Sequence, residues 1–498
     1  MLSFTFKYKN ILQAMRFKIN LKFILFLSII TLHSCISKNE ISIKNYSLFN
    51  NDLISNKRFL KIDSLNLQKL SDDQFLERIQ YDYTRGILNK KEDSIIVIEK
   101  DGYRINLFAI GVFNGWFSRE KASKKVLLYL QQYEKAKHIK GFFPRSFSRK
   151  TGNFVPGIEY YNFGQPYDVV GTAFMATSLK FIIRQFFNKN TEIETEIRQL
   201  CDIICNRIDW DFAYRKDKKC FTWFKNGSDA ELFDGKDLVG EMDETFFIQL
   251  LVLSSKKWSF GDEAYKKYTS KIFVDKQYGY KYFSTKQYDY KNSKQFSGIT
   301  VNNPEILKLF NYPTAKLGYL VQSHIWFDLQ NYRDSVCKIY NMDYFECVQN
   351  AVKAQIKYAQ INPGKNKLYG DVWGFYDTYS PISKKWMVTG LPAKGDYDEG
   401  TIAISAVMSA INFEPKASIK CLRRLYDEYK ELGIYGKDGF VMSVNTNSKE
   451  IAKNPDYFFQ PINVLSIENY RSGLLWNLAK QAPEYQIAFR KAGLKYYK

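Results

Sequence analysis

Histidine is scarce in this sequence, with only His33, His138 and His324 among 498 residues. Zinc sites in proteins draw their ligands from clustered histidines, cysteines and carboxylates, so three scattered histidines argue against a histidine-based metal centre. No metal or cofactor is expected. A Cys–His nucleophile pair is compatible with these counts but has no support from any motif.

Acidic residues are outnumbered, with 52 Asp and Glu against 73 Lys and Arg, which gives a net charge of +21. A basic chain brings nucleic acid or an anionic membrane into consideration. The lysines are spread along the chain, however, and no helix-turn-helix, RNP or zinc-finger pattern occurs. We expect no nucleic-acid partner. An anion-binding surface protein remains a third hypothesis, which steeply salt-dependent nucleic-acid binding would support.

Long apolar runs are missing after the N-terminal region. The apolar stretch at residues 23–32 follows several basic residues and is too short to span a bilayer, but it fits the central part of a secretory signal. It ends in "LHSC" (residues 32–35), which resembles a bacterial lipobox, where the cysteine is lipidated. We therefore predict a lipoprotein signal peptide at residues 1–35, with Met15 as an alternative start and Cys35 as the lipidated residue.

The predicted signal peptide sets where the rest of the chain is expected to be divided into a tether and a folded domain. Residues 36–69 are polar and predict a tether, and residues 70–498 predict one folded domain. The expected protein is an exported bacterial lipoprotein, a monomer held by lipid on the periplasmic face of a membrane or on the cell surface, with the outer membrane favoured. An uncleaved N-terminal anchor is the alternative. The other six cysteines could form disulfides in an exported protein or be buried thiols.

Apolar and aromatic residues are abundant, at 45% and 17% of the chain, which is enough for a large core. From about Leu70 the apolar spacing is helical. Ser118 is a candidate N-cap of the helix that follows it, and Gly433 is a candidate C′ residue. No series of alternating strands and no fixed-period repeat occurs. The chain is therefore predicted to be all-α.

Three acids precede an apolar run in "GEMDETFFIQLL", and Glu244 is the last of them. The run predicts a buried helix. The acids can mark its N-terminus, where negative charge is favourable, or Glu244 can perform chemistry at the edge of an apolar wall. From the residues alone, the helix-start interpretation is favoured.

A second acidic stretch, "GDYDEGTIAIS", contains Asp398 and Glu399. Asp398 can be a catalytic base or the N-cap of a helix beginning near Thr401. A calcium loop is a third interpretation, although the stretch lacks the full acidic spacing for one.

Other side chains have a structural and a ligand-binding interpretation side by side. Asp168 can start a helix or accept a hydrogen bond from a bound ligand. Trp326 and Trp373 can stack on sugar rings, although core packing is the commoner fate of tryptophan. His324 can contact a sugar or be a satisfied structural histidine. Arg471 is spaced to pair with Glu468 on one helix face, with substrate contact as the alternative.

Several stretches, taken in order, resemble one family. "GVFNGWFSREKA", "SHIWFDLQNYRDSV", "GDVWG", "DEGTIAISAVMSAINFEP" and "IENYRSGLLW" are similar to the glucoamylase-like family of bacterial glycoside hydrolases, from about Leu76 to the C-terminus. The resemblance implies an (α/α)6 toroid with its active site in the loops at one end. Members include enzymes that cleave β-1,2-glucans.

The resemblance also assigns roles. Glu244 matches a family glutamate and becomes the expected general acid, which reverses the preference stated above. Asp398 becomes the expected base or water-orienting group, with inversion of configuration. The expected partner is a glycan, bound by Asp168, Glu399, His324, Trp326, Trp373 and Arg471.

The sequence departs from the family at polar positions. Gly171 replaces a glutamate of related glucanases, and Tyr379 and Met442 stand where aspartate is common. Two functions therefore remain in view. The first is a hydrolase acting on a glucan or related oligosaccharide, with β-1,2-glucan as the leading candidate. The second is a catalytically inactive glycan-binding lipoprotein on the same scaffold.

Overall fold

A computed structural model describes residues 67–89, 94–155, 166–226, 237–238, 244–272, 317–361, 368–388, 398–453 and 459–498. Internal contacts divide the chain into Met1–Asn50 and Asn51–Lys498, and every described residue lies in the second unit. The predicted signal peptide, Cys35 and most of the predicted tether thus lie outside the described residues. The first described residue, Leu67, is buried, so packed structure starts slightly before the predicted boundary at residue 70.

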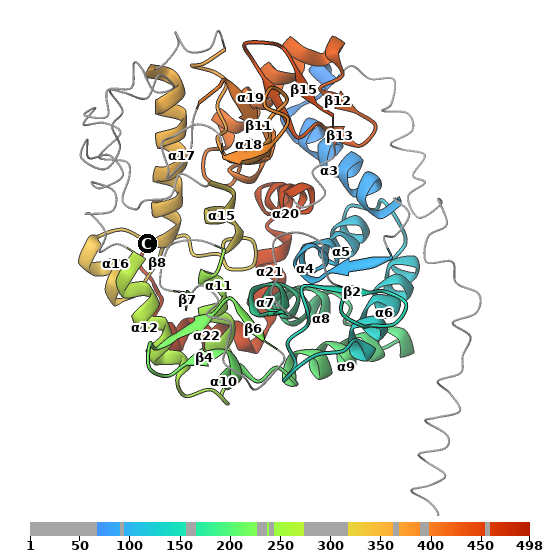
Figure 1. The fold of residues 1–498 in the computed structure, drawn as a ribbon, viewed down its shortest axis with the longest axis vertical. Helices are drawn as coiled ribbons and strands as arrows, with labels where there is room; N and C mark the ends of the chain where they lie inside the picture. Colours follow the sequence, from blue (N-terminus) through green and yellow to red (C-terminus); the bar gives the residue numbers. More distant parts are fainter. Residues whose placement is uncertain are drawn as a thin grey trace, which may run out of the picture. The chain divides into compact units, whose positions relative to one another are not determined.

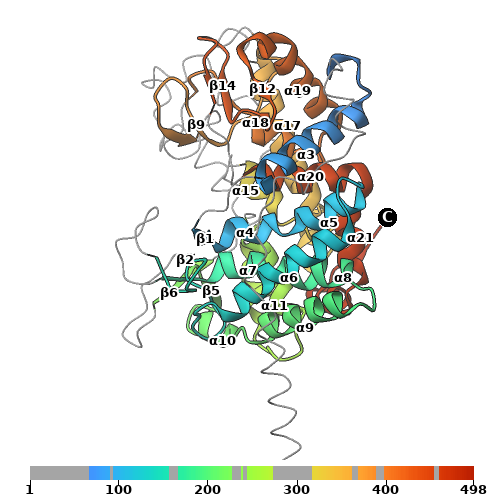
Figure 2. The same cartoon turned by 90° about the vertical axis from the view of Figure 1, so that its right-hand side faces the viewer.

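Helices dominate the second unit and form an inner and an outer layer, which Figures 1 and 2 show from two sides. The inner helices are α4 (Ile98–Arg104), α5 (Asn106–Phe113), α7 (Val169–Ser178), α11 (Phe246–Leu253), α15 (Leu317–Gln322), α18 (Ile404–Ser409) and α20 (Phe459–Ser472). The outer helices are α3 (Asp72–Asn89), α6 (Arg119–Lys135), α9 (Glu192–Asn206), α12 (Gly261–Ile272), α17 (Tyr344–Ile361) and α19 (Pro415–Tyr429). Figure 1 shows the outer helices placed around the inner ones.

Shorter helices complete the layers. A π-helical turn, η5 (Leu179–Ile183), and α8 (Arg184–Phe186) continue α7, and α21 (Leu474–Gln481) and α22 (Pro483–Ala492) follow α20. The remaining short helices are η4 (Leu67–Lys69), α10 (Trp210–Ala213), α16 (Ser335–Tyr340) and η6 (Lys430–Leu432).

The inner helices close a ring. Helix α4 packs on α7, α7 on α11, α15 on α18, α18 on α20, and α20 returns to α4. Between α11 and α15, the backbone N of Phe247 donates to Ser323 Oγ at 3.2 Å. Helix α5 follows α4 after Ile105, so the two together form one inner segment. Because an outer helix carries the chain back between successive inner segments, these segments begin at the same end of the ring. The predicted all-α class and (α/α)6 toroid are confirmed.

Strands of two or three residues lie at the ends of the helices. They are β1 (Ile95–Val97), β2 (Ser146–Ser148), β3 (Pro166–Asp168), β4 (Tyr214–Arg215), β5 (Cys220–Thr222), β6 (Phe224–Asn226), β7 (Asp237–Leu238), β8 (Tyr332–Arg333), β9 (Asp377–Tyr379), β10 (Trp386–Val388), β11 (Thr401–Ala403), β12 (Tyr435–Gly436), β13 (Gly439–Phe440), β14 (Ser443–Asn445), β15 (Ile451–Ala452) and β16 (Lys495–Tyr496). The pairs are antiparallel, for example β1 with β2, β3 with β6 and β11 with β14. Strands β1, β3 and β11 lead directly into α4, α7 and α18, so they fix where these inner helices begin.

Local signals explain several elements. Ser118 caps α6, since its side chain accepts from the backbone N of Lys121 at 3.2 Å, as predicted. Gly433 ends η6 with φ +77°, a conformation that glycine adopts without strain. Every residue of α11 is buried, which confirms the helix predicted from its apolar run. In the described ranges, no helix is both long and apolar enough to cross a membrane.

Candidate active site

Carboxylates stand at the start of three inner helices, α4, α7 and α11. Glu99 is in the first turn of α4, Asp168 is the last residue of β3 and caps α7, and Glu244 comes two residues before α11. All three are buried. Since the inner helices begin at one end of the ring, these acids gather at that end, which is the end predicted to hold the active site.

Glu244 is buried, with 6% of its surface exposed, and the apolar wall expected from the sequence begins two residues later at Phe246. In that wall, Phe247 stacks on Phe174 at 4.8 Å between ring centroids, and Trp326 lies 5.0 Å from Phe247. Thr245 holds the N-cap position of α11, its side chain makes no capping bond, and the first turn of the helix contains no acid. Glu244 therefore does not cap the helix, which weakens the helix-start interpretation.

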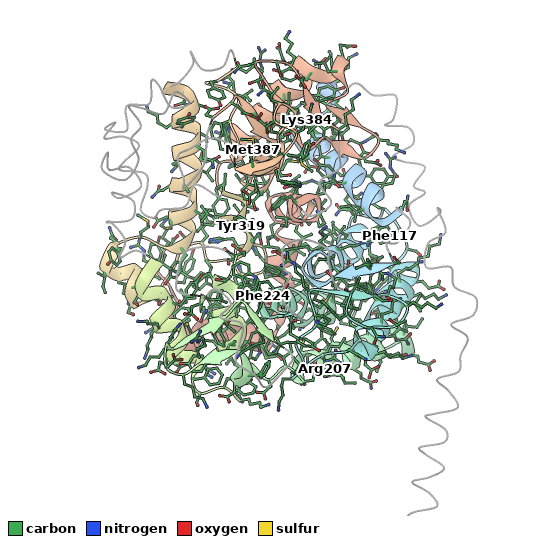
Figure 3. The ribbon with its side chains drawn as sticks, in the orientation of Figure 1. Phe117, Arg207, Phe224, Tyr319, Lys384 and Met387 are labelled. Atoms are coloured by element: carbon green, nitrogen blue, oxygen red, sulfur yellow. The ribbon has the colours of Figure 1, made fainter. Side chains whose placement is uncertain are left out.

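Two tyrosines, the buried Tyr103 and the partly buried Tyr319, connect Glu244 electrostatically to other acids. Burial, together with the charges of Glu99 and Glu244, holds the pKa of Tyr103 well above its usual value. Burial and the charges of Asp377, Glu244 and Glu99 do the same to the pKa of Tyr319, which is labelled in Figure 3. Both tyrosines stay neutral and can donate hydrogen bonds among these negative charges.

The two hydroxyl groups have defined partners. Tyr103 donates to Gln322 Oε1 at 2.6 Å, and Tyr319 donates to Asp377 Oδ2 at 2.7 Å. Asp377 belongs to β9, and Gln322 and Tyr319 belong to α15. The cluster formed by Glu99, Tyr103, Glu244, Tyr319 and Asp377 is called the acid cluster below.

Arg145 joins Glu99 and Asp168. Its Nη2 lies 3.0 Å from Glu99 Oε2, and its Nη1 lies 3.5 Å from Asp168 Oδ2. Asp168 also accepts from the backbone N of Gly171 at 2.8 Å, as a helix N-cap does. Burial raises the pKa of Asp168, and the charge of Arg145 opposes that rise. The structure thus gives Asp168 the structural role considered for it, and its sugar-binding role stays a prediction.

Asp398 and Glu399 lie in a second group. Asp398 accepts from Tyr358 and Tyr369, each at 2.7 Å, and from the backbone N of Gly400 at 2.8 Å. Glu399 accepts from Thr401 Oγ1 at 2.6 Å and from Ser380. The residues after Gly400 form β11, and α18 begins only at Ile404, so the helix predicted near Thr401 starts later and Asp398 does not cap it.

The predicted acid and base therefore have different surroundings. Glu244 shares its electrostatic neighbours with Glu99 and Asp377, whereas Asp398 is hydrogen-bonded to tyrosines of α17 and of the segment before β9. Three donors fix the orientation of the Asp398 carboxylate. Such fixing suits a group that must hold a water in place.

Three aromatic candidates lie in the core. Trp326 is fully buried between Tyr103, Phe174 and Phe247, and Trp373 is 1% exposed. Neither ring has a face open to a sugar, so the stacking prediction is corrected to core packing. His324 lies between Phe345 and Phe413, and burial lowers its pKa to about 3. A sugar contact predicted for His324 is likewise replaced by a place in the core.

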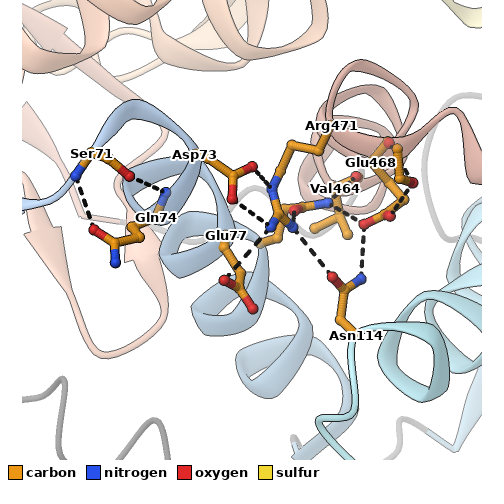
Figure 4. A network of polar contacts seen from close by, with 10 residues as sticks. Ser71, Asp73, Gln74, Glu77, Asn114, Val464, Glu468 and Arg471 are labelled. Atoms are coloured by element: carbon orange, nitrogen blue, oxygen red, sulfur yellow. Dashed lines mark hydrogen bonds and ion pairs between the residues drawn. The ribbon is translucent and has the colours of Figure 1, made fainter.

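Arg471 holds two helices together (Figure 4). It pairs with Asp73 of α3 at 2.8 Å and with Glu77 of α3 at 3.6 Å. The predicted pair with Glu468 is wrong: Asn114 lies between them, accepting from Arg471 at 3.3 Å and donating to Glu468 at 2.9 Å. Arg471 thus fastens α20 to α3, and its sugar contact stays a prediction.

Positions that depart from the family pattern are packed. Met442 is buried, and its sulfur lies 3.3 Å from the backbone N of Tyr379. At Gly171, a Cβ would lie 2.7 Å from both Asp168 Oδ2 and Ile98 Cγ2. Position 171 therefore leaves no room for a side chain, because the cap of α7 and the start of α4 already fill it.

Sequence reasoning missed Glu99, Arg145, Tyr103 and Tyr319. One signal could have identified Glu99, which is the first acid after the apolar run "IIVI". Arg145 had no comparable local signal, because its partners are 46 and 23 positions away in the chain (145 − 99 and 168 − 145). Within the described ranges, no three His, Cys, Asp or Glu side chains are grouped as metal ligands would be.

The sequence is similar to a known protein family and to a characterised relative. Residues 239–483 match the model of a family described as "Putative glucoamylase". Over 404 residues the chain is 26% identical to an exo β-1,2-glucooligosaccharide sophorohydrolase (non-reducing end) of Parabacteroides distasonis, with 80% of this chain and 53% of that protein covered. The chain therefore spans about half the length of that relative.

Solved structures share the fold. A putative glucoamylase from Bacteroides uniformis superposes with a TM-score of 0.69 at 21% identity, covering 86% of this chain and 98% of that one. An endo-β-1,2-glucanase from Chitinophaga pinensis, solved with sophorotriose and glucose, gives a TM-score of 0.67 at 21% identity, covering 86% and 99%. These likenesses agree with the ring of helices described above.

Proposed function

We propose that this chain, glucoamylase-like over residues 239–483 and built on the fold of the endo-β-1,2-glucanase from Chitinophaga pinensis, is a glycoside hydrolase that cleaves β-1,2-linked glucan or its oligosaccharides. The observation that carries the proposal is Glu244, a buried carboxyl at the helix-start end of the ring, beside an apolar wall and among other acids. Burial and neighbouring negative charge both disfavour the charged form of a carboxyl, which is what a general acid needs.

The proposed reaction uses two carboxyl groups. Glu244 gives its proton to the glycosidic oxygen as the bond to the anomeric carbon breaks. Asp398, oriented by Tyr358, Tyr369 and Gly400, takes a proton from a water that attacks the same carbon from the opposite face. Inversion requires about 6.5–9.5 Å between the two carboxyl groups, which leaves room for that water.

The cellular setting is also part of the proposal. Lipid on Cys35 would hold an exported monomer on a membrane, with the outer membrane favoured, and residues 36–69 would tether the folded body. Its partner there would be a glycan and not a nucleic acid. Replacing Cys35 with serine would then remove the lipid mass and release the protein from the membrane fraction.

Product analysis tests the activity. The chain from Ser37 is incubated with a panel of glycans led by β-1,2-glucan, beside the variants Glu244→Gln and Asp398→Asn. We expect new reducing ends from the parent and a loss of at least about 100-fold in kcat for Glu244→Gln, the contribution typical of a positioned general acid. Cleavage that survives Glu244→Gln would remove Glu244 from this role. Product lengths would separate endo from exo action.

A glycan-binding protein without activity is the second candidate. The observation in its favour is that Gly171, Tyr379 and Met442 stand where related glucanases carry acids, and that position 171 leaves no room for a side chain. Binding of one glycan in calorimetry, with no product from any glycan, would select this candidate.

A further inference from the structure

Glu99 is held at the junction of α4 and α7 by both backbone and side chain. The residue before it, Ile98, donates its backbone N to the carbonyl of Arg145 at 3.0 Å. The guanidinium of Arg145 then lies 3.0 Å from Glu99 Oε2. Strand β1, directly before α4, pairs with β2, directly after Arg145, and Val97 lies opposite Ser146. Glu99 and Arg145 are therefore fixed relative to each other before any ligand binds.

Asp168 also pairs with Arg145, but its role is to cap helix α7. One of its oxygens accepts from Gly171 and the other faces Arg145, so Asp168 holds the start of α7. Gly171 adds no functional group to the junction, and a side chain there would collide with Asp168 and Ile98. The α4–α7 junction thus contains two carboxylates. Asp168 caps α7, whereas Glu99 caps no helix.

Glu99 also shares electrostatic neighbours with Glu244, the proposed general acid. Its charge and that of Glu244 both act on Tyr103 and Tyr319, the two phenols of the acid cluster. Tyr103 lies one helical turn after Glu99 on α4. Glu99 is 8% exposed, so a small part of its surface stays accessible.

We propose that Glu99 is a specificity-determining residue, a carboxylate that accepts a hydrogen bond from a hydroxyl of the sugar beside the bond that Glu244 protonates. The inference rests on the proposed function and deepens it. Arg145 and the β1–β2 pair already hold Glu99 in place. Binding a sugar therefore costs little additional conformational entropy of the Glu99 side chain. A hydroxyl bound to a carboxylate forms a strong hydrogen bond, and a sugar lacking that hydroxyl would leave the carboxylate unpaired.

Steady-state kinetics on a β-1,2-glucooligosaccharide of defined length test the proposal. For Glu99→Gln we expect kcat/KM to fall roughly 10- to 100-fold, the range for losing a charged hydrogen bond, with most of the change in KM. Glu99→Asp should recover part of the loss. Glu194→Gln is the matched control, since Glu194 is also a buried glutamate paired with an arginine, Arg119 at 2.7 Å, but on outer helix α9.

A purely structural role predicts a different result. Both Gln variants would then lower the unfolding temperature, and neither would change KM. If Glu99→Gln has parental kinetics while the parent cleaves, the inference fails and the proposed function stands. If the parent binds the oligosaccharide without cleaving it, calorimetry of Glu99→Gln decides, because equal affinity overturns the inference. If the parent neither binds nor cleaves, both proposals fail.

Discussion

The individual acidic residues of this protein differ in the groups that surround them and donate hydrogen bonds to them. Asp168 is tied to a helix start, Asp398 is fixed by two tyrosines and a backbone N, and Glu244 stands among other carboxylates against an apolar wall. The same side-chain chemistry therefore has three uses. Glu244 combines burial with neighbouring carboxylates, the surroundings on which its proposed role as proton donor rests.

His324 predicts how stability depends on acid. Its pKa falls from 6.5 to about 3 because burial between aromatic rings disfavours the charged ring. The unfolded chain therefore binds a proton between these pH values and the folded chain does not. The free energy of unfolding should fall by about 1.4 kcal/mol per pH unit as pH decreases through this window.

Replacing His324 isolates this effect. His324→Phe keeps an aromatic ring between Phe345 and Phe413 and removes the titrating group. Denaturant unfolding from pH 7 to pH 4 should show a shallower loss of stability for the variant than for the parent. Parallel loss in both proteins would mean that other groups dominate acid unfolding.

The sequence could predict the acid at Glu244 but not its neighbours. Glu244 carries a local signal, an acid directly before an apolar run. Glu99, Arg145 and Tyr319 become neighbours of the site only through the packing of α4, β2 and α15. Trp326 and Trp373 show the converse. Their sequence surroundings do not tell a core ring from a binding surface, and burial decides it.

At the scale of elements, periodicity predicted the helices well and missed the short strands. Ser118 and the run in α11 placed two helices correctly, because a cap and an apolar face are local features. The residues after Asp398 read as a helix beginning near Thr401 but form β11, since pairing with β14 takes up Thr401–Ala403. Such pairing partners are distant in the chain and leave no local pattern.

Gly171 tests how tightly α4 and α7 are joined. Alanine normally favours a helix over glycine by about 1 kcal/mol. At this position its Cβ would lie 2.7 Å from Asp168 Oδ2 and from Ile98 Cγ2, so we expect Gly171→Ala to destabilise by about 1–3 kcal/mol. Thermal unfolding measures the change.

A second glycine provides the control. Gly261 opens α12, and a Cβ there would meet Val252 Cγ1 at 3.3 Å, a milder contact. Gly261→Ala should change the unfolding temperature much less. A stabilised Gly171→Ala would show that the α4–α7 junction has more room than the structure gives it.

At the scale of the whole molecule, cysteines do not hold the fold together. The six cysteines in the described part of the chain are free, and five of them are buried. Burial raises the pKa of Cys205 and of Cys220 to about 11, which keeps these thiols protonated and unreactive. The buried-thiol interpretation, left open by the sequence, is the one that the structure supports.

Reducing agent should therefore leave the unfolding temperature unchanged. Removing a native disulfide typically costs about 2–5 kcal/mol, so a hidden disulfide would be evident as a lower unfolding temperature. Thiol titration gives a second measurement. The unfolded protein should release thiols that the native protein does not expose.

Closure of the ring has a consequence for how the protein is made. Arg471 and Asp73, which fasten α20 to α3, are 398 positions apart. At about 5–20 residues per second, a ribosome needs roughly 20–80 s to travel those 398 positions. Helix α3 is the first α-helix of the described residues to emerge, yet the surface that it buries on α20 is made almost last. For most of its synthesis the nascent chain therefore carries an open arc, in which the buried face of α3 still lacks its partner, and a chaperone would meet that arc rather than the finished ring.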